Sequence, residues 1–135
     1  MKRIVTMCAL LVLLVGMCST AQATTFTKTV QCYNENGAYE KTALSNEMIF
    51  CTHHLYVQYN AQGCSNSYTN HFRGYCEDGL LINSKWITPG GGYYIESAGF
   101  CEGWRYYLTM RGNTRYYENE GLTNIVLAGW FDPNK

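Results

Sequence analysis

The pattern that most constrains this chain is a set of short alternating segments separated by turn residues. In residues 54–59 every second side chain can form a core, with Leu55, Val57 and Tyr59 on one side and His54, Tyr56 and Gln58 on the other. A period of two residues places successive side chains on opposite faces of a β-strand. We therefore predict a strand with one buried face in this segment.

Similar segments recur roughly every ten residues, a spacing typical of all-β domains. The segments that we predict to be strands are residues 27–33, 47–60, 70–76, 80–87, 93–96, 103–110, 115–118 and 122–131. We expect the last of these to be a central strand, because its apolar run suits cover on both faces. This pattern predicts an all-β fold, a small antiparallel β-sandwich or barrel.

Two connecting segments carry expectations of their own. The segment 39–51 contains good helix formers, but Thr42, Ser45 and Asn46 interrupt it, so at most a short helix or a turn is expected. The Pro89–Gly92 run has the composition of a flexible hairpin turn.

The N-terminal residues have the features of a secretory signal peptide. Lys2 and Arg3 precede an apolar run from Ile4 to Met17, and the small-x-small sequence Ala21-Gln22-Ala23 follows. We predict a signal peptide over residues 1–23 and one β-rich domain over residues 24–135, secreted or periplasmic, with no transmembrane segment after signal removal. A lipid anchor at Cys18 is the lesser alternative, since Met17 is larger than the residue expected there.

Five cysteines remain after Ala23: Cys32, Cys51, Cys64, Cys76 and Cys101. Disulfides persist outside the cytoplasm, so we expect a disulfide-stabilised domain with at most two intrachain bridges. The short loop between Cys64 and Cys76 favours that pair. The odd cysteine is then a free thiol or the link of a covalent dimer.

Charge narrows the choice of partner. Loss of Lys2 and Arg3 leaves eight basic and ten acidic residues, a net charge of −2. Nucleic-acid binding domains carry a clustered basic surplus, so no nucleic-acid partner is expected.

Aromatic residues point to a binding surface. All 12 tyrosines, 5 phenylalanines and 3 tryptophans follow Ala23. In segment 103–110, Trp104, Tyr106, Leu108 and Met110 are predicted to face the core, and Arg105, Tyr107, Thr109 and Arg111 to face solvent. Tyrosine and arginine contribute strongly to interfaces. We therefore predict a noncatalytic module that binds a glycan or a protein through an exposed sheet face carrying Tyr93, Arg105, Tyr107, Arg115 and Tyr117.

Metal and cofactor sites are not expected. Adjacent His53 and His54 would point to opposite faces of a strand, and with His71, Cys51 and Cys76 they lack the paired spacing of zinc ligands. The glycines after Pro89 lack the Lys-Ser/Thr of a phosphate loop.

Two further functions stay open. One is a secreted antagonistic factor, such as a small toxin or a bacteriocin-like protein. The other is a small secreted hydrolase in which His54, His71 or Glu102 acts as acid or base. Because no nucleophile elbow or catalytic cysteine signature occurs, the sequence favours a binding protein over an enzyme.

Overall fold

The structure, a computed structural model, describes residues 22–31, 38–62, 69–113 and 124–135. It contains eight strands: β1 (Thr24–Gln31), β2 (Glu40–Lys41), β3 (His54–Gln62), β4 (Asn70–Cys76), β5 (Leu81–Ile87), β6 (Gly92–Glu96), β7 (Tyr106–Arg111) and β8 (Asn124–Asp132). The described residues form no helix. The predicted all-β class is confirmed.

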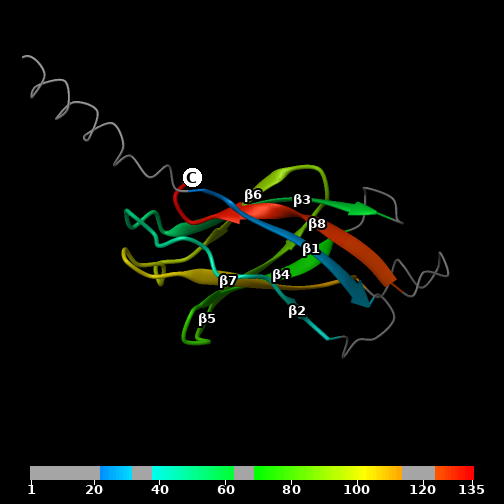
Figure 1. Cartoon of the computed structure of the whole chain (residues 1–135), viewed down its shortest axis with the longest axis horizontal. Coiled ribbons are helices and arrows are strands. Elements are labelled where there is room, and N and C mark those ends of the chain that lie inside the picture. Colours follow the sequence, from blue (N-terminus) through cyan, green and yellow to red (C-terminus); the bar gives the residue numbers. More distant parts are fainter. Residues whose placement is uncertain (1–21, 32–37, 63–68, 114–123) are drawn as a thin grey trace, which may run out of the picture.

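The strands form two antiparallel sheets that pack face to face (Figure 1). One sheet has the order β1-β8-β3-β6, and the other has the order β2-β7-β4-β5. The fold is thus sandwich-like. Strands β1 and β6 lie at the edges of one sheet, and β2 and β5 lie at the edges of the other. The position of β8 between β1 and β3 confirms that the last strand is central.

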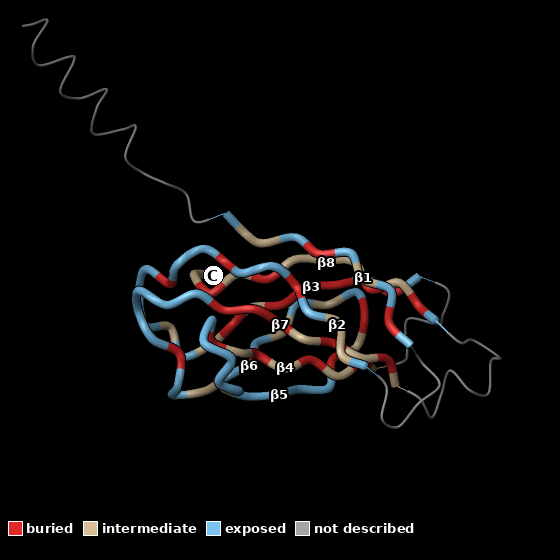
Figure 2. The backbone as a smooth tube through the Cα atoms, turned by 60° about the horizontal axis from the view of Figure 1, so that its bottom comes forward, coloured by how far each residue is buried: buried red, intermediate tan, exposed pale blue. Residues whose placement is uncertain are grey.

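The core lies between the sheets and follows the predicted alternation (Figure 2). Leu55, Val57 and Tyr59 of β3 are buried, whereas their neighbours in the strand face outward. In β7 the residues Tyr106, Leu108 and Met110 are fully buried, as predicted. Trp104, which was predicted to face the core with them, is 40% exposed, because it lies before the first residue of β7. At about 25 cal/mol per Å² of buried apolar surface, these side chains supply the main force that holds the sheets together.

A buried tyrosine ties the two sheets together with polar contacts. The Tyr59 hydroxyl on β3 donates a hydrogen bond to the Ile87 carbonyl of β5 at 2.5 Å. The Asn70 side-chain amide of β4 donates to the same hydroxyl at 3.0 Å. Because a buried hydroxyl without partners is costly, these bonds allow a tyrosine to fill the core at this position.

Segment 39–51 forms no helix. After β2 the chain continues along β7, where two buried hydroxyl groups take part in backbone pairing. Thr42 Oγ1 accepts a hydrogen bond from Leu108 N at 2.9 Å, and Ser45 Oγ accepts one from Tyr106 N at 3.0 Å. The hydroxyl groups that interrupt a helix thus complete the edge of a sheet.

Two other predictions at turns and strand ends need correction. The Pro89–Gly92 segment joins β5 to β6, which belong to different sheets, so it crosses over rather than forming a hairpin. The strand predicted over 47–60 begins only at His54. Ile49 and Phe50 before it are exposed, because they precede the point where β3 pairs with β6 and β8.

The predicted disulfide stays a prediction. Cys64 lies outside the described residues, as do Cys32 and most of the signal peptide. Within the described residues, Cys51, Cys76 and Cys101 carry free thiols, and Cys76 is buried.

Candidate functional site

The structure does not bring the sequence-predicted site residues together on one surface. Tyr93 lies in β6, in the β1-β8-β3-β6 sheet, where it is partly buried against the core. Tyr107 lies in β7 of the other sheet. Arg105 precedes β7 and pairs with Glu47 over 3.7 Å, an exposed ion pair that contributes little to stability. Arg115 and Tyr117 lie outside the described residues.

The outer surface of the β2-β7-β4-β5 sheet instead assembles a set of aromatic and cationic side chains. We call this set the aromatic–cationic face: Tyr39, Lys41, His71, Arg73, Tyr75, Trp86, Tyr107 and Arg111. Since Phe72, Gly74 and Cys76 of β4 face the core, the residues that alternate with them, His71, Arg73 and Tyr75, face outward. Pairing of His71 with Arg111 on one side and with Trp86 on the other carries this surface across three strands.

The Tyr39 ring lies at the centre of this face. The guanidinium carbon of Arg73 is 4.0 Å from the ring centroid, and that of Arg111 is 5.1 Å away. The Tyr39 hydroxyl and His71 Nδ1 are hydrogen-bonded over 2.7 Å. Both arginine heads are therefore held by an aromatic ring, whose negative π-face attracts a cation.

Trp86 provides the most accessible aromatic surface of the group. Its ring stacks on the His71 imidazole with 4.6 Å between centroids and 26° between planes. The Arg111 guanidinium carbon lies 5.8 Å from the Trp86 ring centroid. Nevertheless, 46% of Trp86 is exposed, so the indole is held in position by its neighbours while much of it faces solvent.

Tyr107 supports the face from beneath. It stacks on Tyr75 with 5.2 Å between centroids and 2° between planes, and Lys41 Nζ lies 3.6 Å from its ring centroid. Only 7% of Tyr107 is exposed, and burial raises the pKa of its hydroxyl. The residue lies on the outer side of β7, as predicted, but Lys41 and Tyr75 cover it.

The electrostatics of the face are cationic. Burial, together with the nearby charges of Arg73 and Arg111, lowers the pKa of His71 from 6.5 to about 4. The imidazole is consequently neutral at pH 7, and the charge comes from the lysine and the two arginines. No carboxylate of the described residues forms an ion pair with Lys41 or Arg73, so these cations remain available to an anionic group.

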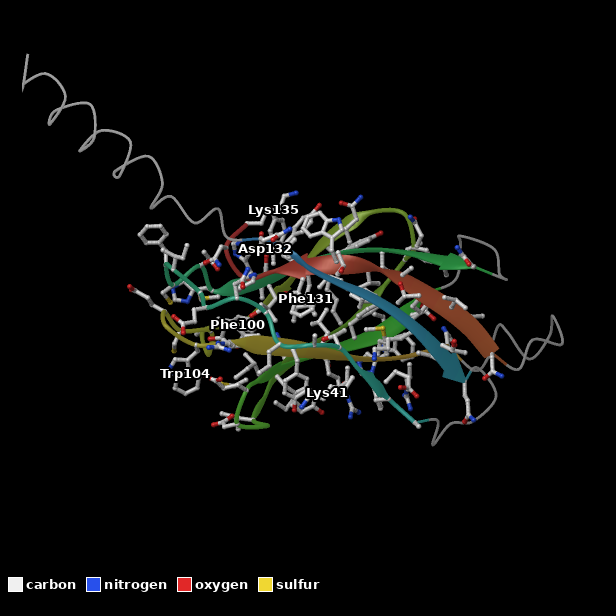
Figure 3. All side chains as sticks on the ribbon, in the orientation of Figure 1. Lys41, Phe100, Trp104, Phe131, Asp132 and Lys135 are labelled. Atoms are coloured by element: carbon white, nitrogen blue, oxygen red, sulfur yellow. The ribbon has the colours of Figure 1, made fainter. Side chains whose placement is uncertain are left out.

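The opposite sheet carries a second aromatic surface, which we call the β3–β8 strip: His54, Tyr56, Tyr94, Trp130 and Lys135. The Tyr56 ring contacts Trp130 at 5.0 Å and Tyr94 at 5.1 Å between centroids. Lys135 Nζ lies 4.3 Å from the Tyr56 centroid and 4.6 Å from that of Trp130. Figure 3 places Lys41 and Lys135 on opposite sides of the sandwich, with Phe131 between them.

The alternative chemistries find less support in this arrangement. His54 and His71, both considered as acid–base groups, lie on the outer surfaces of opposite sheets and so do not share a site. Across the described ranges, no three His, Cys, Asp or Glu residues gather closely enough to hold a metal ion. In the same part of the chain, no helix has the length and apolar character needed to cross a membrane.

Sequence reasoning missed Tyr39, His71, Arg73 and Trp86 as members of one surface. A usable signal was present in residues 70–76, where the predicted strand already implied that His71, Arg73 and Tyr75 share a side. Tyr39 had no such signal. It lies directly before β2, a strand of only two residues, which is too short to show an alternating pattern.

The fold and the site define an antiparallel sandwich-like domain with an open aromatic and cationic sheet surface. No protein family, curated protein or solved structure matches the chain significantly.

Proposed function

We propose that the chain is a secreted, noncatalytic binding module whose aromatic–cationic face binds a glycan that carries anionic groups. The observation that carries this proposal is the exposed Trp86 ring, which stacks on His71 on the same sheet face as two arginines that pack on Tyr39. The signal peptide predicted over residues 1–23 supports secretion.

The chemistry of the face suits such a ligand in two ways. A pyranose ring presents a row of weakly positive C–H groups, which pack on the negative π-face of an indole. A carboxylate or sulfate on the same sugar accepts paired hydrogen bonds from a guanidinium group, whose planar donors match its geometry. Trp86 and Arg73 thus supply complementary parts of one contact.

Rigidity further supports the proposal. Trp86 packs on His71, and the His71 ring is hydrogen-bonded to Tyr39, so these side chains are already ordered. A ligand that meets ordered groups loses less free energy to the freezing of side chains.

The test is binding of the mature protein to a panel of polysaccharides containing uronic acid, sulfated sugars or neutral sugars. Calorimetry or retardation in affinity gels would measure it. We expect binding to the acidic members and weaker binding as salt rises, because charged contacts are screened. Trp86→Ala should weaken affinity at least tenfold, and Trp130→Ala on the opposite sheet is the matched control.

Three results would count against the proposal. Binding that depends on Trp130 but not on Trp86 would place the site on the other sheet. Absence of binding to every acidic polysaccharide would exclude this ligand class. Binding of a protein that is abolished by Trp86→Ala would support the aromatic–cationic face as the site but contradict a glycan as its ligand.

A further inference from the structure

Two exposed thiols lie at one end of the sandwich, where the chain entering β3 meets the connection between β6 and β7. The β3–β6 pairing ends with His54 opposite Glu96, and Ser97 N then donates a hydrogen bond to the His53 carbonyl at 2.9 Å. His53 adopts a φ of 57°, in the left-handed region that few non-glycine residues occupy. Next to this bend, Cys51 comes to lie against residue 100.

The two thiols are within reach of each other. Cys51 Sγ donates a hydrogen bond to the Phe100 carbonyl oxygen at 3.0 Å. In a trans peptide that oxygen is about 2.8 Å from the next Cα, so Cys51 Sγ lies within about 6 Å of Cys101 Cα. Cys101 Sγ donates a hydrogen bond to the Gly99 carbonyl oxygen at 3.6 Å. Side-chain rotation and a small shift of these exposed segments would bring the two sulfurs together.

A buried tyrosine fixes the backbone of Cys101. The Cys101 amide donates to the Tyr106 hydroxyl at 2.6 Å, and that hydroxyl donates to the Cys101 carbonyl at 3.1 Å. Burial is the main reason that the pKa of Tyr106 is raised, and negative charge on Cys101, Cys76 or Cys51 acts in the same direction. Three cysteines thus lie around one ordered side chain.

Accessibility separates these three thiols. Cys51 and Cys101 are exposed, whereas Cys76 is 1% exposed, and burial raises the pKa of its thiol. The reactive form of cysteine is the thiolate, so the buried thiol is the least able to exchange. An oxidant in solution would meet Cys51 and Cys101 first.

We propose that Cys51 and Cys101 form a disulfide in the secreted protein. The oxidant is a disulfide, either a small molecule or the active-site disulfide of an oxidoreductase. Cys51 attacks one of its sulfurs, a mixed disulfide forms and one thiol leaves; Cys101 then attacks the Cys51 sulfur and releases the second thiol. The two cysteines lose two electrons and two protons, and the oxidant becomes two thiols.

The bridge would fasten β4 and β5, two of the four strands that carry the proposed binding surface. It closes a loop over residues 51–101 that contains β3, β4, β5 and β6. It also joins the two segments beside an open cleft of about 460 Å³ lined by residues 52–54 and 96–98. A disulfide that closes a loop of this length is expected to raise Tm by about 10 °C relative to the reduced protein.

The test uses the full mature chain, prepared reduced and then oxidised with oxidised glutathione. Free thiols are alkylated, and the protein is digested without reduction and mapped by mass spectrometry. We expect a linked pair of peptides containing Cys51 and Cys101, and no alkylation of the buried Cys76 before unfolding. Cys51 or Cys101 bridged to another cysteine, or both left alkylated, would overturn the proposal.

Thermal unfolding supplies a second readout. Cys51→Ser, Cys101→Ser and the double variant should each lower Tm by about 10 °C, because loss of either sulfur removes the same bridge. Reductant should lower Tm of the parent by about 10 °C more than it lowers Tm of the variants, which lack this bridge. Serine keeps a hydrogen-bonding group at each position, so the loss of Tm can be assigned to the missing sulfur. Two results would contradict the bridge: losses of Tm that add in the double variant, or equal sensitivity of the parent and the variants to reductant.

Discussion

The outer surfaces of the two sheets are both rich in aromatic residues, but their cations are used differently. On the β3–β8 strip, Lys135 of the chain itself lies over Tyr56 and Trp130, and its carbonyl oxygen is 2.6 Å from His54 Nε2. On the aromatic–cationic face, Arg73 packs on Tyr39, and Arg111 lies between that ring and an exposed tryptophan, Trp86.

Acidic residues sharpen the contrast. Outward positions of the strip sheet include Glu96 in β6 and Asp132 in β8. Outward positions of β7 and β4, by comparison, contain no carboxylate. Aromatic content alone therefore does not define a binding surface. Cations pack on aromatic rings in both sheets, and the two surfaces differ in that the strip sheet also carries outward carboxylates, whereas β4 and β7 carry none.

The largest expected change in the free energy of unfolding comes from glycines in the strands beneath the two surfaces. A Cβ at Gly129 of β8 would lie 2.1 Å from the Gln58 carbonyl oxygen and 2.6 Å from Tyr59 Cα, so backbone would have to move. A Cβ at Gly74 of β4 would lie 3.2 Å from Leu55 Cδ1, the end of a side chain that can shift. Gly129→Ala should lower the free energy of unfolding by about 3 kcal/mol and Gly74→Ala by about 1 kcal/mol. Urea unfolding measures both, and equal losses would show that β8 and β3 are not held as closely as the structure has them.

Arg73→Lys tests whether the face recognises an anion by geometry or by charge alone. Lysine keeps the charge but loses the planar pair of donors, so affinity for an acidic polysaccharide should fall about tenfold, or roughly 1.4 kcal/mol. Titration calorimetry measures this change. Lys135→Arg on the strip is the control, and an unchanged affinity in Arg73→Lys would reduce the role of Arg73 to a point charge.

The pH dependence of stability should depend on His71. The unfolded chain takes up this proton near pH 6.5 and the folded protein only near pH 4, so the contribution is complete above pH 6.5 and is lost as pH falls toward 4. Because His71 is only half-buried and solvent screens the arginine charges, we expect a loss on the order of 1 kcal/mol.

Urea unfolding at pH 7, 5.5 and 4.5 would measure the loss in the parent protein and in His71→Gln. The variant should have a flatter profile over this range. Parallel profiles would show that protonation of His71 does not oppose folding.

The smallest effect concerns the two lysines over aromatic rings. Lys41→Met and Lys135→Met should each lower the free energy of unfolding by about 0.5 kcal/mol, the usual size of an exposed cation–π contact. Only Lys41→Met should also weaken binding of an acidic ligand. Weaker binding in Lys135→Met alone would transfer the ligand site to the strip.

Much of the fold could be predicted from local pattern. The segment 70–76 was predicted with the same bounds as β4, and the core side of β7 was predicted residue by residue through Tyr106, Leu108 and Met110. Alternation succeeded there because one face of each strand must be dry. It failed over 39–51, where the hydroxyls of Thr42 and Ser45 pair with a strand more than 60 residues away.

The candidate site was less accessible to prediction. The type of surface, tyrosine with arginine on a sheet, was predicted, but its proposed members were spread over both sheets and beyond the described residues. Nothing local to Tyr93 and Tyr107 indicates that their strands belong to different sheets.

By itself the sequence determined most of the strand positions and the buried side of β3 and β7, because these depend on the period of neighbouring side chains, and it fixed the supply of aromatic and cationic residues. The tertiary structure decided which strands are neighbours. Only that choice places Tyr39 between Arg73 and Arg111, lays Trp86 on His71, and separates this group from the Tyr56 and Trp130 rings. Pairing between distant strands depends on how all of the buried faces fit together, and no short segment contains that information.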